Sequence, residues 1–279
     1  MPKVTLAVCI YREGDLLARQ LDHAEGCYDE LVVVHDGPDD TNVRAIVEAH
    51  GGRFYERPRA YQQEPHWPFA WGQARNDWVL RWDADEFPSP ELCAWLIAFR
   101  AADEPPAEVS GYTAIIPLWD GRRERTRRWP HRVVLVNRQR VRYFGMADQA
   151  PIADGRFEPL DVVLHHQPDR PSYGIWYTLK RPTSRRWHAE IARALLGKPT
   201  DLACWRWDDP VWPAKWEAVR RAPLRTGLRR LLLSPIGNAR SMIRAGEFPN
   251  PELLTFFPLQ HWMTCWQFHR ARKAARDAR

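Results

Sequence analysis

Apolar segments that stop at acidic residues are the feature that most constrains the fold of this chain. Residues 4–10, 30–35 and 78–82 are almost unbroken apolar runs, and the last leads directly into Asp83 and Asp85. An apolar run without polar alternation is typical of a strand that is buried on both faces, as in a parallel sheet. We therefore expect a parallel sheet whose strands end near acidic side chains.

Segments with helical spacing separate these strands. Apolar residues fall on one helical face within 16–24, 42–50 and 90–101, and a short strand is expected at 53–56. Alternating strands and helices predict an α/β fold with a mostly parallel central sheet and flanking helices. Further along the chain the pattern predicts a loop at 58–73, strands at 111–118 and 160–166, and a hairpin that pairs 132–136 with 140–144.

Charge divides the chain into two parts. Residues 1–169 carry 20 Lys and Arg against 27 Asp and Glu, whereas residues 170–279 carry 21 against 8. We therefore expect a sheet domain at 1–170 and a helical, basic, Trp-rich C-terminal region at 171–279. A basic region binds anionic lipid, nucleic acid or an acidic substrate, and charge alone does not choose among them. Its amphipathic helices are expected either to pack on the sheet domain or to lie on an anionic membrane.

The sequence also bears on location. The N-terminus does not have the pattern of a signal peptide, and the apolar runs are too short to span a bilayer. The five cysteines include no Cys-x-x-Cys pair, so neither a zinc site nor a disulfide framework is indicated. A cytoplasmic protein is expected, with peripheral contact at the inner face of the membrane as an extension of that expectation.

Asp83 and Asp85 form an Asp-x-Asp pair at the end of a buried strand. Two carboxylates at this position suit a divalent cation that also binds a diphosphate, because Mg²⁺ and Mn²⁺ prefer oxygen ligands. Ligands of parallel sheets bind beyond the carboxyl ends of the strands, where Glu13 and Asp36 also lie. The alternative is an acidic loop without a metal.

The order of these motifs resembles that of family 2 glycosyltransferases, which have the nucleotide-diphospho-sugar (GT-A) fold. The similarity covers roughly residues 4–170. It is carried by Arg12-Glu13 after the first strand, by Asp36 to Asp40 after the second, and by Asp77 to Glu86. Three later segments resemble the branch that acts on lipopolysaccharide core and other cell-surface glycans, namely Trp129-Pro130, Gly145 to Asp148 and Leu164 to His166.

The resemblance implies an inverting, metal-dependent transferase. It would move a sugar from a nucleotide diphosphate, UDP or GDP, to a hydroxyl of a glycan, a lipid-linked acceptor or a small molecule. It further implies that Asp36 contacts the nucleobase, that Tyr11 and Glu13 line the base and ribose pocket, and that Asp83 contacts the ribose or the metal. Asp85 would bind Mn²⁺ or Mg²⁺ directly.

Four assignments keep an alternative. His166, or else His165, would complete the metal shell, because neighbouring residues of a strand point to opposite faces. Asp148 is either the general base or a surface turn residue. Glu86 is expected to be a solvated carboxylate at a helix start, with a role beside the metal ligands as the alternative. The alternative for Asp36 is to cap the helix near 42–50, although Asp40 is the cap that we expect there.

Two other functions compete with glycosyl transfer. The basic C-terminal half would suit a nucleic-acid-binding protein, although no recognised nucleic-acid motif is present. A nucleotidyltransferase on a related fold would use the same nucleotide, but residues 11–15 lack a Gly-rich basic loop.

Overall fold

The computed structural model describes residues 1–143, 150–169, 171, 173, 192–193, 196 and 214–277. The chain divides into two compact units, residues 1–145 with 149–170 and residues 146–148 with 171–279. Each unit is described by itself. Among the described residues, no helix has the length and apolar content that a membrane-spanning segment requires.

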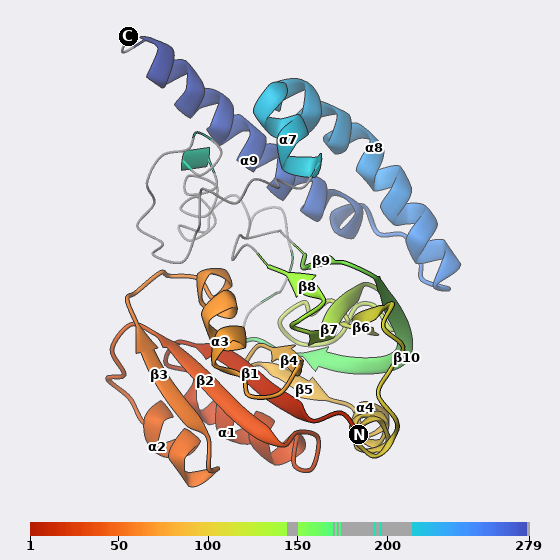
Figure 1. Cartoon of the computed structure of the whole chain (residues 1–279). Coiled ribbons are helices and arrows are strands. Elements are labelled where there is room, and N and C mark those ends of the chain that lie inside the picture. The colour runs from red at the N-terminus through yellow and green to blue at the C-terminus, as the bar shows by residue number, and fades with distance from the viewer. Residues whose placement is uncertain are drawn as a thin grey trace. The chain divides into compact units, whose positions relative to one another are not determined.

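The first unit is built on a sheet in the strand order β3-β2-β1-β4-β7-β6-β10-β5 (Figure 1). The strands β3, β2, β1 and β4 are parallel to one another, and β7, beside β4, runs antiparallel. Their bounds are β1 Val4–Ile10, β2 Glu30–Asp36, β3 Arg53–Arg57, β4 Trp78–Trp82, β5 Glu86–Pro88, β6 Val109–Ile115, β7 His131–Asn137 and β10 Arg156–His166. A separate ribbon pairs β8 Val141–Arg142 with β9 Ile152–Ala153.

Helices cover both faces of this sheet (Figure 1). On one face lie α1 Gly14–His23, α2 Val43–Ala49 and α4 Pro90–Ala101; on the other lie the 3₁₀ helix η1 Glu64–His66 and α3 Trp67–Gln73. The strand β1 shows why both faces are needed. Leu6 and Val8 pack in the core with α1, whereas Ala7 and Cys9 pack in the second core with α3. Every β1 residue is buried, as an unbroken apolar run requires.

Most expectations for this unit are confirmed. The strands at 4–10 and 78–82 and the helix at 90–101 have the expected bounds, and the parallel order of the first four strands is as predicted. The expected hairpin is wrong. The strand β7 enters the centre of the sheet between β4 and β6, and residues 141–142 pair with β9 instead. A strand in the centre of a sheet needs a hydrogen-bonded partner on each edge, and β4 and β6 supply both for β7.

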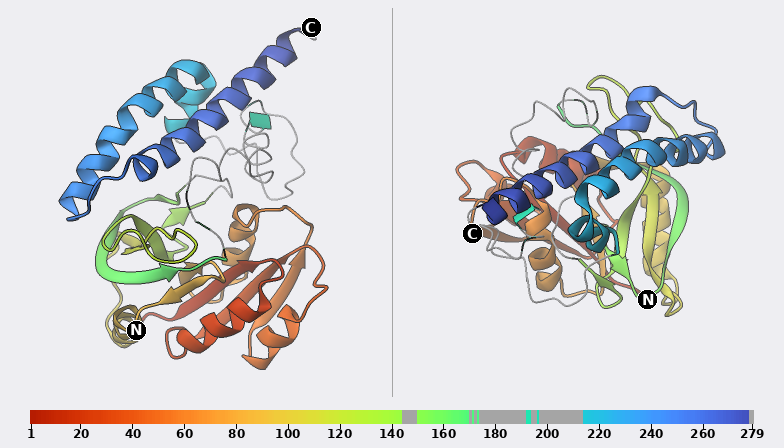
Figure 2. Two further views of the ribbon diagram at one scale, coloured as in Figure 1. Left: turned by 180° about the vertical axis from the view of Figure 1, so that it is seen from behind. Right: turned by 90° about the horizontal axis from the view of Figure 1, so that it is seen from above.

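The second unit contains three described helices, α7 Ala214–Arg221, α8 Pro223–Arg244 and α9 Pro251–Asp277. The helices α8 and α9 run antiparallel, side by side (Figure 2). Gly227 allows this close approach, because a Cβ there would lie 2.8 Å from Trp262 and 2.9 Å from Cys265. Trp216 of α7 and Met242 of α8 are fully buried. The expected helical character of this region is therefore present in residues 214–277.

Candidate functional site

The site lies where the parallel strands end. The strands β2, β1 and β4 are neighbours, with Ile10 beside His35 and Val8 beside Trp82. Because parallel strands end at the same edge of a sheet, Tyr11, Asp36 and Asp83 follow three adjacent strand ends. The sequence expectation of one shared edge is therefore met by the strand order.

Asp85 lies beside His166. The Asp85 Oδ2 and His166 Nε2 atoms are 3.4 Å apart, and both side chains are mostly buried. The strand β10 brings them together, because it pairs with β5 in an antiparallel register that places His166 opposite Glu86. The Gln167 N–H donates to the Asp85 carbonyl over 2.9 Å. His165 points elsewhere, with its Nδ1 2.6 Å from Glu124 Oε1.

The Asp85 and His166 side chains shift each other's ionisation. Burial acts to raise the pKa of Asp85, but the hydrogen bond and charge of His166 outweigh it and lower that pKa. Burial acts to lower the pKa of His166, but Asp85 outweighs it and raises that pKa. Both directions favour a negative carboxylate beside a positive imidazolium. In this environment Asp85 remains an anion, which is the form that binds a cation. His166 binds a cation only after it has released its proton, because a ligating imidazole is neutral.

Asp83 is held by three neighbours. Its carboxylate Oδ2 accepts from Gln63 Nε2 over 2.8 Å, and its backbone N–H donates to Glu86 Oε2 over 2.9 Å. Gln20 Nε2 donates to its carbonyl oxygen. These bonds fix the turn after β4, so the Asp83 carboxylate keeps one position relative to the strand ends.

Glu86 is not the solvated carboxylate that the sequence suggested. It lies in β5, is 1% exposed, and has Arg132 Nη1 3.4 Å from its Oε1 atom. Burial, followed by the charge of Asp83, raises the pKa of Glu86 to about 7. The expectation failed because the helix after this segment begins only at Pro90. Glu86 instead supports the turn that carries Asp83 and Asp85.

Asp36 is buried under the segment that follows β3. Its Oδ1 atom is 2.8 Å from His66 Nε2 and also accepts from the Ala60 N–H, and its Oδ2 atom is 3.0 Å from Arg59 Nη1. The Arg59 guanidinium carbon lies 3.1 Å from the centre of the Tyr11 ring. In this structure the carboxylate of Asp36, which was expected to contact the nucleobase, therefore has Arg59, Ala60 and His66 as its partners.

The turn after β1 has an unusual backbone. Arg12 has a φ of 60°, a region that non-glycine residues rarely adopt. Its guanidinium pairs with Asp40. The Tyr11 N–H donates to Glu13 Oε2 over 3.4 Å. Asp40 is therefore not the helix cap. The N-cap of α2 is Asn42, whose side chain makes no capping bond, and the Arg44 N–H in the first turn donates instead to Asp39 Oδ2 over 2.9 Å.

Three residues that surround the carboxylates do not follow from the sequence pattern. Arg59, Gln63 and His66 come from the segment between β3 and α3, which was predicted to be a plain loop. The signal was a cluster of polar and aromatic residues in a segment that directly follows a strand ending at the site. Asp148, the predicted general base, lies outside the described residues.

A metal ion would have two adjacent ligands here. Across the described part of the chain, no three His, Cys, Asp or Glu side chains form a group that could hold a metal ion. Asp85 and His166 offer one carboxylate and one imidazole at a single point. This set fits Mg²⁺ or Mn²⁺, ions which commonly take one or two protein carboxylates and complete their shell with substrate phosphate and water.

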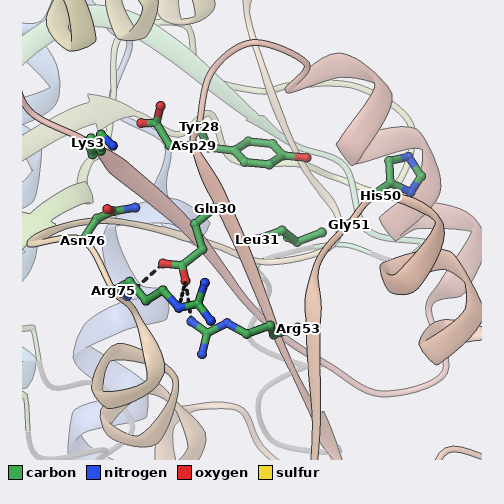
Figure 3. A pocket seen from close by; sticks show the side chains of 10 residues that line it. All are labelled: Lys3, Tyr28, Asp29, Glu30, Leu31, His50, Gly51, Arg53, Arg75 and Asn76. Atoms are coloured by element: carbon green, nitrogen blue, oxygen red, sulfur yellow. Dashed lines mark hydrogen bonds and ion pairs between the residues drawn. The ribbon is translucent and has the colours of Figure 1, made fainter.

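A hollow of 340 Å³ at the opposite ends of the strands is not part of this site (Figure 3). Glu30 lies at its centre and pairs with Arg53, with Arg75 Nε 3.8 Å away. Asp29, also in its wall, pairs with Arg100. The two acidic side chains of this hollow are thus paired within the fold, and Asp83 and Asp85 do not line it.

Comparison with known proteins identifies the family of this chain. The model of glycosyl transferase family 2 matches residues 5–163, more than half of the chain. Solved structures with similarity include a mycobacterial protein, 17% identical with a TM-score of 0.33, matched over 41% of this chain and 41% of that one. The mannosyltransferase PcManGT of Pyrobaculum calidifontis, solved with GDP-Man and Mn²⁺, is 19% identical over 100% of this chain and 88% of that one, with a TM-score of 0.46. S. aureus TarS is 15% identical over 99% and 92%, with a TM-score of 0.34. No curated protein matches the chain.

Proposed function

Because the chain belongs to glycosyl transferase family 2 and its sheet has the GT-A arrangement, we propose that it transfers a sugar from a nucleotide diphosphate to an acceptor hydroxyl with inversion. Family membership sets aside the two competing interpretations, a nucleic-acid-binding protein and a nucleotidyltransferase. The donor is a UDP- or GDP-sugar, and the acceptor is a glycan, a lipid-linked glycan or a small molecule. A cytoplasmic location belongs to the same proposal.

One observation carries this proposal: Asp85 and His166 meet at the strand ends, next to the turn that holds Asp83. In the proposed complex, Asp85 and His166 hold a divalent cation, which neutralises the departing diphosphate when it is bound. Asp83 contacts the ribose or a water on the cation. The Asp85–His166 pair supplies the protein part of the cation site, and the donor phosphates complete it.

The remaining roles concern orientation and proton transfer. Asp36 accepts a hydrogen bond from an N–H of the base, as a carboxylate can from uracil or guanine. The backbone at Tyr11 and Glu13 lines the base and ribose pocket. Asp148 takes the proton from the acceptor hydroxyl on the face opposite the leaving group, as inversion requires. With the base and ribose held, the anomeric carbon is presented to that hydroxyl in one orientation.

Thermal unfolding with nucleotide sugars tests the proposal. UDP-, GDP-, dTDP- and CDP-sugars are each added with and without Mn²⁺. One nucleotide is expected to raise the Tm, and only when the metal is present. Asp85→Ala should lose this response, whereas Asp22→Ala, which removes a carboxylate that is 76% exposed on α1, should keep it. No response to any donor, or an unchanged response in Asp85→Ala, contradicts the proposal.

The stereochemical part has its own measurement. Slow hydrolysis of the donor by the enzyme releases a sugar whose first-formed anomer can be followed by NMR. Inversion predicts the anomer opposite to that of the donor. Release of the same anomer would contradict inversion without contradicting donor binding.

A further inference from the structure

The outward face of α8 combines large aliphatic and basic side chains. Five aliphatic residues on this helix are each 50–63% exposed, and they are Leu228, Leu232, Leu233, Ile236 and Ile243. Exposed arginines share the same helical stripe, at positions 225, 229, 240 and 244. These nine residues are called the α8 face. A helix that shows this much apolar surface to water is unusual in a soluble domain.

Within the described residues 214–277, this face is not the side of α8 that packs against another helix. The opposite side of α8 already packs against α9 (Figure 2). At this contact Gly227 meets Trp262 and Cys265. Pro223, Gly227 and Met242 are the buried residues of α8, and none belongs to the α8 face. The exposed aliphatic side chains therefore need another explanation than helix packing.

Charge identifies the kind of partner. The helix α8 carries five arginines and no Asp or Glu. A groove of about 1040 Å³ between α7 and α8 is lined by Arg221, Arg225, Arg229 and Arg230, with Glu217 as its one acidic residue. Phe248, 90% exposed, follows α8 in the connection to α9. This combination has positive charges for anionic headgroups and aliphatic side chains for the acyl boundary.

We propose that the α8 face docks on an anionic phospholipid bilayer, with α8 lying in the plane of the interface. Leucine and isoleucine side chains enter the boundary between headgroups and acyl chains. Arginine side chains extend from the same face so that the guanidinium groups stay at the phosphates. The groove between α7 and α8 receives further headgroups. This surface lies outside the donor site, so the proposal does not depend on the proposed reaction.

Two other partners fit the α8 face less well. A second copy of the chain would bring the four arginines of one α8 face against the four of another, and like charges across an interface oppose association. A nucleic acid would pair with the arginines but leave the five aliphatic side chains in water, since phosphates and sugars dominate such contacts. The bilayer is the partner that satisfies both kinds of side chain.

Vesicle sedimentation of the full chain tests the proposal. Vesicles of phosphatidylcholine alone are compared with vesicles that also contain phosphatidylglycerol. The chain is expected to sediment with the anionic vesicles, less at high salt, and hardly at all with phosphatidylcholine. Because each basic residue near an anionic surface strengthens binding about fivefold, Arg229→Gln/Arg240→Gln should weaken it at least tenfold. Leu232→Ser/Leu233→Ser should weaken it by a similar factor.

The matched control removes the same charge elsewhere. Lys273→Gln/Arg276→Gln changes two exposed basic residues of α9, and binding should fall less than threefold. Circular dichroism and Tm verify that each variant is folded, and Ile236→Ser gives a second apolar variant. Equal sedimentation with both vesicle types would overturn the proposal. So would binding that the leucine variant leaves unchanged, a dimer in solution that this variant dissociates, or a preference for single-stranded RNA over vesicles.

Discussion

At the scale of single residues, Glu30 connects four segments of the first unit. Its carboxylate accepts from the Thr5 hydroxyl of β1 over 2.6 Å and from the Arg75 N–H over 2.8 Å, and it pairs with Arg53 of β3. Burial acts to raise the pKa of Glu30, but these three hydrogen bonds outweigh it and lower the pKa. The Glu30 carboxylate therefore stabilises the folded state when it is ionised.

We predict that Glu30→Gln lowers the free energy of unfolding by about 2 kcal/mol at neutral pH, since hydrogen bonds to a charged group are stronger than neutral ones. A lowered folded-state pKa means that this stabilisation is present above the unfolded-state pKa, about 4.3. It is lost as the pH falls through the folded-state pKa. Urea unfolding at several pH values measures the difference from wild type.

The difference between wild type and Glu30→Gln should shrink as the pH falls below about 4. Glu25→Gln, a change at an exposed residue beyond α1, should alter stability by less than about 0.5 kcal/mol at any pH. A gap between wild type and Glu30→Gln that stays constant with pH would show that ionisation of Glu30 is not the cause.

Asp148 allows a second prediction at this scale, from its proposed role as general base. Asp148→Asn should leave the metal-dependent rise of Tm with the donor unchanged, because the donor is held by other residues. Turnover should fall by about a hundredfold or more, since a positioned base contributes on that order. Initial rates of sugar transfer measure the loss. Normal transfer rates in Asp148→Asn would show that Asp148 is not the general base and would favour a surface turn residue.

At the scale of elements, a segment is predicted well from the sequence when its conformation depends on its own residues. The strands β1 and β4 can be predicted because an unbroken apolar run must be buried on both faces, and the run itself is visible in the sequence. The helix α3 was missed because Pro68 suggested a loop. Proline is compatible with the first turn of a helix, where its missing N–H has no partner in any case.

The site was predictable to the same extent. Asp36 and His166 are the last residues of β2 and β10, Asp83 and Asp85 follow β4, and strand ends can be located from apolar runs. The contacts of Arg59, Gln63 and His66 with these carboxylates depend on how the segment after β3 folds back over the sheet edge. Strand partners such as those of β7 likewise depend on distant segments. The local sequence pattern determines neither these side-chain contacts nor the strand partners.

The packing of α8 on α9 supplies the element-scale prediction. Gly227→Ala would place a Cβ 2.8 Å from Trp262 and 2.9 Å from Cys265, closer than carbon atoms approach. We expect a loss of about 1–3 kcal/mol, the usual cost of overpacking a well-packed contact. Gly237→Ala in the same helix meets nothing within 4 Å and should stabilise α8 by up to about 1 kcal/mol. Thermal unfolding of the two variants should therefore shift in opposite directions, and equal shifts would contradict the close contact.

At the scale of the whole molecule, each unit has an apolar core of its own. The two clusters around the sheet consist of residues between Val4 and Leu164. In the second unit, α7, α8 and α9 bury Trp216, Met242, Phe256 and Phe268. The two units also differ in charge, because the acidic residues that we propose to hold the donor lie in the first unit and the basic α8 face lies in the second. The charges suit an anionic donor held through a cation and an anionic surface held directly.

We therefore predict that residues 1–170 fold without the rest of the chain. A domain of this size buries roughly 70% of the surface that its unfolded chain exposes, which suffices for a stable core. The fragment should unfold in one cooperative transition and should keep the metal-dependent Tm rise with the donor that the full chain prefers. It should not sediment with anionic vesicles, because the α8 face is missing. Asp85→Ala in the fragment is the matched control for donor binding. A fragment that shows no cooperative transition would mean that the sheet depends on residues 171–279, and vesicle binding by a folded fragment would move the lipid contact to the first unit.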